Sequence, residues 1–259
     1  MKLLFIGDIF GRSGRRVVKQ HLPRLRKETG CDLVVANGEN LSGGNGMTVK
    51  NTDEILAAGV DLFTGGNHSF AHHEVYEQRR SKLIRPANLE TGAPGDGTAI
   101  LAAGGARIGV VNLLGRGFMK MPATCPFRRM EAIVTEWEAE RLDGILVDLH
   151  AETTSEKAAF FHYFDGRVAA ICGTHTHVPT ADAAVSGQGT FFISDVGMTG
   201  PADSVIGFVP KKAIANFLSP TGEKSADPAT GPGILRGVLL DIAGQKTHTW
   251  HVINIAETL

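Results

Sequence analysis

Residues 3–8 read Leu3-Leu-Phe-Ile-Gly-Asp8, four apolar residues followed by a glycine and an acid. A short apolar run of this kind is typical of a buried β-strand. The residues that follow, 13–27, place Val17, Leu22 and Leu25 on one helical face. A strand followed by an amphipathic helix predicts an α/β unit with parallel strands.

The same pattern of short apolar runs bounded by Gly, Asp or Asn recurs along the chain, and we expect each run to be a strand. The further runs are 33–36, 60–63, 108–114, 145–149, 168–171, 191–193 and 234–242. Further helices are expected at 52–58, with Asn51 as the N-cap, at 127–142 and at 155–164. Because the C-terminal third is rich in strands, two packed sheets fit better than one doubly wound sheet. In the strand expected at 247–255, apolar and polar residues alternate. This pattern is typical of a strand at the edge of a sheet, where the strands of two subunits can pair.

The net charge, the number of cysteines and the length of the apolar runs limit the classes of function that fit this chain. The 259 residues include 26 Lys and Arg against 27 Asp and Glu, a net charge of −1. This balance argues against binding of long nucleic acid, which requires a basic surface, but not against a nucleotide substrate. There are three cysteines, too few for a disulfide framework, and no apolar run long enough for a signal peptide or membrane span. We therefore expect one cytoplasmic domain over 1–259, with 218–232 as a long loop.

Polar side chains follow five of the predicted strands at the point where each strand ends. They are Asp8, Glu39, Asn40, Asn67, His68, His150, His175 and His177. Ligands and metals gather where the carboxyl ends of strands meet in α/β sheets. Each residue taken singly is more often a turn former or a buried polar group, but five such strand ends together indicate a common site.

The number and kind of these side chains indicate a pair of metal ions. A single zinc site uses three or four ligands, whereas Asp8, Glu39, Asn67, His150, His175 and His177 already supply six, with Asn40 a seventh. Carboxylate, carboxamide and imidazole groups bind first-row transition metals. Two ions about 3.5–4 Å apart that share one bridging carboxylate would use all of them.

The order of these motifs resembles the calcineurin-like metallophosphoesterases, and within them the bacterial YmdB-like branch. The matching stretches are Gly-Asp-Ile-Phe-Gly-Arg-Ser-Gly-Arg at 7–15, Ala-Asn-Gly-Glu-Asn at 36–40, Thr-Gly-Gly-Asn-His at 64–68 and Gly-Thr-His-Thr-His-Val-Pro-Thr at 173–180. The similarity extends to 85–88 and 194–200 and thus covers nearly the whole chain. It implies a four-layer α/β/β/α sandwich with a two-metal centre at one edge.

The resemblance also implies a role for each residue. Glu39 would bridge two divalent ions, iron or manganese, and His68 would be the acid or base beside them. The first ion would be held by Asp8 and His177, and the second by Asn67, His150 and His175. Members of this branch resemble phosphodiesterases that hydrolyse 2′,3′- and 3′,5′-cyclic mononucleotides with a metal-activated hydroxide.

One departure from the superfamily pattern stands out. The first motif usually supplies Asp and His two residues apart, but here Phe10 occupies the histidine position. We expect the side-chain oxygen of Asn40 to replace the missing ligand. Arg12 and Arg116 lie in stretches rich in glycine and are candidates for contact with the substrate phosphate, although solvated surface charges are equally consistent with the sequence.

Three other functions compete with this interpretation. Residues 7–14 follow a strand and open a helix like a dinucleotide-binding loop, but they have neither the GxGxxG spacing nor the Gly-Lys-Ser/Thr of a P-loop. A non-catalytic protein that senses a nucleotide or an RNA end would keep the same site. A phosphomonoesterase such as a 5′-nucleotidase would use the same scaffold, because selectivity between monoester and diester depends on the shape of the pocket.

Overall fold

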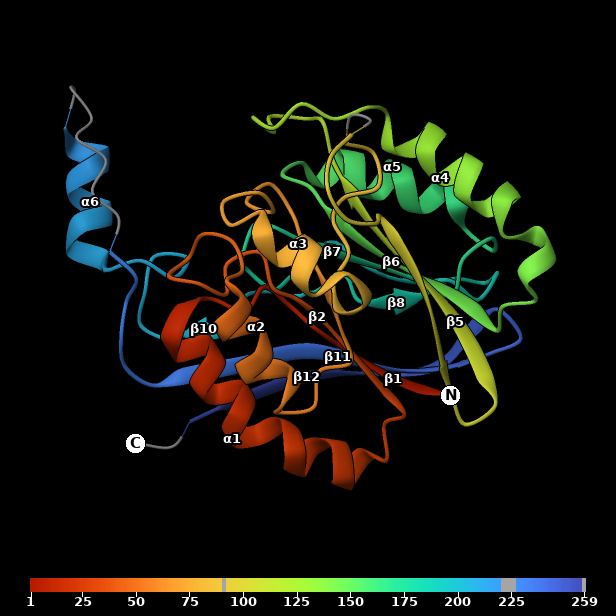
Figure 1. Ribbon diagram of the computed structural model, residues 1–259, viewed down its shortest axis with the longest axis horizontal. Coiled ribbons are helices and arrows are strands. Elements are labelled where there is room, and N and C mark those ends of the chain that lie inside the picture. The colour runs from red at the N-terminus through yellow and green to blue at the C-terminus, as the bar shows by residue number, and fades with distance from the viewer. Residues whose placement is uncertain (90–91, 220–226, 258–259) are drawn as a thin grey trace.

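The chain folds into two mixed β-sheets that pack face to face, with helices on both outer sides, as seen in the computed structural model (Figure 1). The structure describes residues 1–89, 92–219 and 227–257, so the long loop predicted for 218–232 lies mostly outside the described residues. This arrangement confirms the four-layer α/β/β/α sandwich expected from the motifs.

The first sheet contains the N-terminal strands. In spatial order they are β10 (Gly200–Pro201), β11 (Gly233–Ala243), β1 (Lys2–Ile6), β2 (Leu33–Asn37) and β3 (Leu62–Thr64), with β12 (Lys246–Ala256) paired to β11. Strands β1, β2 and β3 run parallel, whereas β11 is antiparallel to β1. The carboxyl ends of β1 to β3 therefore meet at one edge, and the start of β11 lies beside them.

The second sheet is built mainly from the middle of the chain. Its order is β4 (Thr98–Ala103), β5 (Ala106–Leu114), β6 (Gly144–His150), β7 (Ala170–Thr174), β9 (Phe191–Ile193) and β8 (Ala184–Val185). Strands β5, β6, β7 and β9 are parallel. Strand β4, Thr-Ala-Ile-Leu-Ala-Ala, was not predicted, nor were the two-residue strands β8 and β10, and none of the β4 residues is fully buried.

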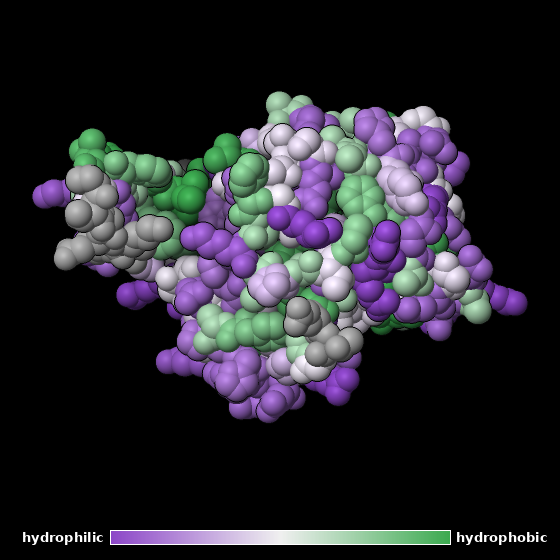
Figure 2. Space-filling model, turned by 90° about the horizontal axis from the view of Figure 1, so that it is seen from above, coloured by the Kyte–Doolittle hydropathy of each residue, from purple (hydrophilic) through white to green (hydrophobic). Residues whose placement is uncertain are grey.

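The helices cover the outer faces of the two sheets, with short 3-10 turns at Arg80–Lys82 and Glu138–Glu140. On the first sheet lie α1 (Gly11–Thr29), α2 (Val49–Leu56) and α3 (Glu74–Gln78), and on the second lie α4 (Pro126–Glu136) and α5 (Thr154–Phe164). A sixth helix, α6 (Pro210–Leu218), has no buried residue and projects with apolar surface at one end of the molecule (Figures 1 and 2). Among the described residues, no helix is both long and apolar enough to cross a membrane.

Three apolar layers hold the sandwich together. Leu4 of β1 packs toward α1, whereas its neighbour Phe5 points into the layer between the sheets. Both are almost fully buried, because successive residues of a strand face opposite sides and both sides of β1 are covered. The outer layer of the second sheet joins Val147 of β6 to Phe160 of α5.

Two predicted helix boundaries were wrong. The helix expected at 52–58 begins at Val49, because Thr48 is its N-cap and accepts a hydrogen bond from the Asn51 backbone N–H. Asn51 is therefore inside the first turn rather than the cap. The helix expected at 127–142 ends at Glu136 and continues only as a short 3-10 turn.

Candidate metal centre

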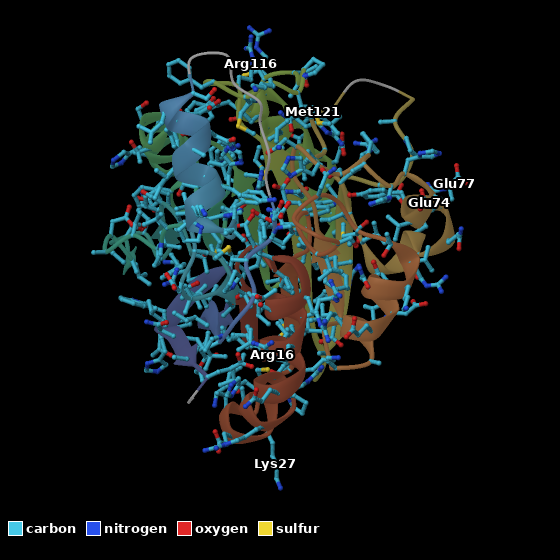
Figure 3. All side chains as sticks on the ribbon, turned by 90° about the vertical axis from the view of Figure 1, so that its left-hand side faces the viewer. Arg16, Lys27, Glu74, Glu77, Arg116 and Met121 are labelled. Carbon is cyan, nitrogen blue, oxygen red and sulfur yellow. The ribbon has the colours of Figure 1, made fainter. Side chains whose placement is uncertain are left out.

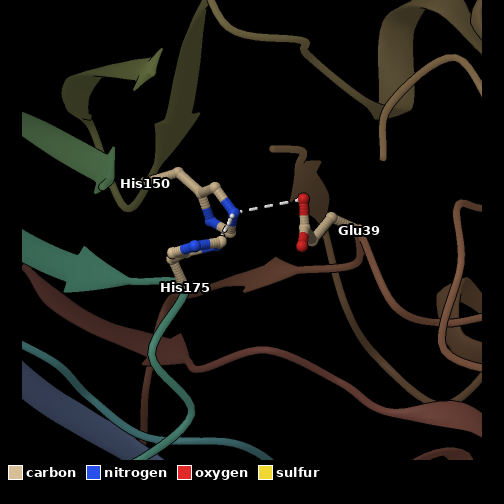
Figure 4. A group of neighbouring side chains, drawn as sticks. All are labelled: Glu39, His150 and His175. Carbon is tan, nitrogen blue, oxygen red and sulfur yellow. Dashed lines mark hydrogen bonds and ion pairs between the residues drawn. The ribbon is translucent and has the colours of Figure 1, made fainter. Parts of the chain in front are cut away.

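Side chains from the carboxyl ends of four strands, two in each sheet, meet at one end of the sandwich. Glu39 follows β2, His150 ends β6 and His175 follows β7, and their ligand atoms all lie within 4.8 Å of one another (Figure 4). Asn67, which follows β3, adds its Oδ1 at 3.0 Å from His150 Nε2. The convergence predicted from the sequence is therefore present for these four residues.

The imidazole of His150 contacts each of the other three residues, and hydrogen bonds to its neighbours set its tautomer. The Thr174 hydroxyl donates to Asp148 Oδ1 at 2.6 Å, so its oxygen is left to accept from His150 Nδ1 at 2.9 Å. The Nδ1 of His150 thus carries a proton, and in the neutral ring Nε2 presents a lone pair. Groups that orient a ligand histidine in this way are typical of metal sites.

Nε2 of His150 faces other atoms that also present lone pairs. Glu39 Oε2 lies 3.2 Å away and His175 Nδ1 lies 3.1 Å away. The Nε2 of His175 is 3.0 Å from the Glu152 carboxylate, which favours a proton there and leaves Nδ1 of that ring without one. Together with Asn67 Oδ1, four acceptor atoms converge on a space that suits a cation, either a proton on His150 or a metal ion.

The pKa values describe this cluster when no metal is bound. Burial lowers the pKa of His150, but the negative charges of Glu39, Asp8 and Asp148 together outweigh burial and raise the pKa to about 9. Burial and the neighbouring His150 charge lower the pKa of His175 to about 3. Without a metal, the cluster therefore holds a second proton on His150, at Nε2, and a metal ion that binds there must displace that proton.

A second group lies on the other side of Glu39. Asp8 follows β1 and is fully buried, and its Oδ1 has no hydrogen-bond partner among the described residues. His177 Nε2 lies 3.8 Å from that oxygen and 3.0 Å from the Asn40 amide nitrogen. Burial raises the pKa of Asp8. An unpaired buried carboxylate oxygen beside an imidazole is the arrangement expected of a ligand pair.

Glu39 lies between the two groups and divides its oxygens between them. Its Oε2 faces His150, and its Oε1 accepts from the Asn40 amide at 3.1 Å. Space for the carboxylate is provided by Gly66, where a Cβ would lie 2.0 Å from Glu39 Oε2 and 2.5 Å from His150 Nε2. The glycine before Asn67 is thus required by close packing at the site.

Asn40 lies among Glu39, His68 and His177, but its amide is not oriented as expected of the replacement ligand. Its amide nitrogen, rather than its oxygen, is turned toward Glu39 and His177, while its Oδ1 lies 3.1 Å from His68 Nδ1. Rotation of the amide by 180° would bring the oxygen to the position expected of a ligand.

His68 stands at the rim of the cluster. Its backbone N–H donates to Glu39 Oε2 at 3.1 Å, and its Nδ1 lies 3.2 Å from Glu39 Oε1. The side chain is 39% exposed, whereas that of Glu39 is 1% exposed, so the ring lies between the buried cluster and solvent. The Gly65-Gly66 turn therefore allows two adjacent residues, Asn67 and His68, to reach the same site.

Residues that the sequence analysis did not single out hold the histidines in place. The buried Lys157 donates to the Thr174 carbonyl at 2.8 Å and pairs with Asp195 at 3.1 Å. Asp195 also accepts from the backbone and hydroxyl of Thr176, between the two loop histidines. A lysine within a helix gives no sequence signal of burial, whereas Asp195 lies within the 194–200 stretch that carried the resemblance.

The backbone of the histidine loop is held in an unusual conformation. His175 has φ 97° and His177 has φ 67°, both in the region that residues other than glycine rarely adopt. Such conformations cost on the order of 1–3 kcal/mol each and persist where the surrounding structure enforces them, often at functional sites. Here the contacts of Asp195 provide that constraint, and both rings turn toward the cluster.

The two arginines considered for substrate contact lie outside the cluster. Arg12 is in the first turn of α1 rather than in a loop, and its side chain is exposed. Arg116 is also exposed, at one end of the molecule (Figure 3). It lines a cavity of about 450 Å³ with Arg128 and Arg129 at the start of α4. Neither arginine therefore belongs to the group of candidate ligands.

The fold and the site together define the class of protein. The chain has the fold of the metallophosphoesterases, and it superimposes on a 5′-nucleotidase precursor of Thermus thermophilus with a TM-score of 0.58 and 14% identity, covering 99% of this chain and 54% of that one. At that identity the likeness shows the fold alone. Residues 4–255 match the YmdB-like protein family, and the chain belongs to it.

Individual relatives match the chain over nearly its whole length. A 2′,3′-cyclic-nucleotide 2′-phosphodiesterase of Bacillus subtilis (strain 168) is 39% identical over 247 residues, which is 95% of this chain and 92% of the relative. A structure from Thermus thermophilus, described as a hypothetical protein, has a TM-score of 0.93 and 39% identity over the full length of both chains. A novel phosphatase of Mycoplasma pneumoniae has a TM-score of 0.92 and 34% identity, covering 99% of this chain and 93% of that one. The resemblance drawn from the motifs is confirmed.

Proposed function

We propose that this protein is a dinuclear metal-dependent phosphodiesterase that hydrolyses 2′,3′-cyclic mononucleotides. The observation that carries the proposal is the convergence of acceptor atoms on His150 Nε2, which suits a cation, next to the buried Asp8 carboxylate, whose Oδ1 has no hydrogen-bond partner among the described residues. The substrate class is supported by the B. subtilis relative, which covers nearly the whole chain.

The residues divide into two sets around Glu39, and this division supports two metal ions. We assign Asn67, His150 and His175 to one ion and Asp8, Asn40 and His177 to the other, with Glu39 shared. The three imidazoles favour iron or manganese over magnesium, which prefers oxygen ligands and retains its water. When bound, such ions polarise phosphate oxygens and lower the pKa of an attacking water.

The reaction then needs a proton for the leaving oxygen. Water adds to phosphorus, the bond between phosphorus and O2′ breaks, and O2′ takes a proton. His68 is placed to supply it, because Nδ1 is engaged by Asn40 and Glu39 while the ring is partly open to solvent. The product is the nucleoside 3′-phosphate.

The test is an assay of 2′,3′-cyclic AMP with product identification by ³¹P NMR, alongside metal analysis of the purified protein. We expect adenosine 3′-monophosphate and two equivalents of iron or manganese. Chelation should abolish turnover, and manganese or anaerobic ferrous iron should restore it, whereas full recovery with magnesium alone would contradict the assigned ligands. Faster hydrolysis of p-nitrophenyl phosphate than of its diester would favour the phosphomonoesterase, and ligand binding without turnover would favour a sensor.

A further inference from the structure

Arg236 occupies an unusual position at the start of β11. The strand runs antiparallel to β1, and Gly7 donates its backbone N–H to the Arg236 carbonyl at 3.1 Å. Arg236 is therefore next to the strand end that carries Asp8. The Arg236 backbone is fixed further by Thr199, which exchanges two hydrogen bonds of 3.0 Å with it.

The guanidinium group of Arg236 lacks a partner although it is partly buried. Its Nε is buried and has no hydrogen-bond partner among the described residues, and no carboxylate of those residues forms an ion pair with it. Desolvation lowers the pKa of Arg236, and no acidic neighbour in the described part of the chain counteracts this effect. An arginine remains charged in a protein, so an unpaired and partly desolvated guanidinium is costly unless an anion binds it.

Arg236 lines a cavity that adjoins the metal centre. The cavity has a volume of about 220 Å³ and shares a wall with the candidate ligand His177. Pro179, Met198, Ser204 and Ile206 are among its other lining residues. Binding sites for whole small molecules are typically about 300–1,000 Å³, so this cavity is suited to one chemical group rather than to a nucleoside.

We propose that Arg236 and this cavity form a subsite for a second phosphate group of the substrate, on the Asp8 and His177 side of the centre. The inference rests on the proposed function and narrows its substrate class to cyclic nucleotides that carry a further phosphate, such as 5′-phosphorylated 2′,3′-cyclic nucleotides. A phosphate suits the site because its oxygens accept from guanidinium N–H groups in a bidentate, charge-assisted manner.

The first experiment measures binding to the purified holoprotein without turnover. Adenosine 3′-monophosphate and adenosine 3′,5′-bisphosphate, which differ only in the second phosphate, are titrated by calorimetry. We expect the bisphosphate to bind at least about tenfold more tightly, as for one charge-assisted contact. Arg236→Gln should abolish the difference, Arg236→Lys should retain part of it, and Arg24→Gln, at a highly exposed position, should leave it unchanged.

Inorganic phosphate titrated alone distinguishes a subsite for substrate from a site for the free ion. If Arg236→Gln weakens phosphate binding but the two nucleotides bind wild type equally, the cavity binds free phosphate only and the inference is overturned. Equal nucleotide affinities in wild type overturn it even if the variant fails to fold.

Kinetics separate this inference from the proposed function. Wild type should show a higher kcat/KM for 5′-phosphorylated 2′,3′-cyclic AMP than for 2′,3′-cyclic AMP, with the difference in KM. Arg236→Gln should remove that preference, whereas the exposed control Arg24→Gln should retain it. If no cyclic nucleotide is hydrolysed while the bisphosphate still binds through Arg236, the proposed function fails and the subsite stands. If both cyclic nucleotides are hydrolysed with the same kcat/KM, the proposed function stands and the subsite is overturned.

Discussion

The ring of Phe10 packs edge-on against the imidazole of His177, with the ring centroids 5.8 Å apart. Phe10 stands at the position where the superfamily motif carries a histidine ligand, and it is 1% exposed. A second edge-on contact joins it to Phe208 at 5.0 Å. Phe10 thus packs directly against a candidate ligand, His177.

Replacement of Phe10 by alanine should therefore destabilise the fold. The cavity left by a buried phenylalanine costs about 3–5 kcal/mol in the free energy of unfolding, which urea denaturation measures. Phe10→Leu is the control and should cost less, because it fills most of the volume. A loss below about 1 kcal/mol for the alanine variant would show that the ring is not a packing element.

Metal content should distinguish Glu39 from Asn40. Glu39→Gln removes the charge shared by both groups, so both equivalents of metal should bind more weakly. Asn40→Ala removes a candidate ligand that we assign to the Asp8 and His177 side, so one equivalent should be lost more readily than the other. Elemental analysis after dialysis against increasing chelator measures this. If Glu39→Gln retains two tightly bound ions, Glu39 does not bridge.

His68→Ala should separate proton donation from metal binding. We expect both metals to remain, with a rate loss on the order of 10²–10⁴ on 2′,3′-cyclic AMP, whose leaving alkoxide needs a proton. The loss should be much smaller with bis-p-nitrophenyl phosphate, whose leaving group is stable as an anion. Equal losses on both substrates would instead assign His68 to substrate positioning, and loss of metal would make it a ligand.

The metal-free protein should lose stability as the pH rises from neutral to alkaline. The pKa of His150 is raised to about 9 from its ordinary value of 6.5, so its proton stabilises the fold fully below pH 6.5, and this contribution is lost as the pH passes 9. Thermal unfolding of chelator-treated protein at pH 6.5, 7.5 and 9 measures the effect. His150→Gln should flatten the dependence, and a midpoint that rises over this range would contradict the assignment.

Much of the candidate site was predictable because it depends on topology. Parallel strands of one sheet end at the same edge, so polar residues placed after β1, β2 and β3 must be neighbours. The same holds for His150 and His175 at the ends of β6 and β7. The sequence shows each strand by its apolar run and each candidate ligand by its place after that run, and no detail of packing is needed.

The sequence by itself determined most of the strands, the α/β class and the residues that gather at the sheet edge, since these depend on local patterns. Only the tertiary structure decided that Lys157 is buried beneath the histidine loop and that Phe10 supports His177. It alone placed Arg236 beside Gly7, at the strand end that precedes Asp8. These contacts join residues far apart in the chain, and they arise because β11 inserts antiparallel to β1 and the two sheets pack face to face. No periodicity in the sequence encodes these contacts. Each contact depends on how whole helices and strands are arranged, and not on the residues adjacent to it in the chain.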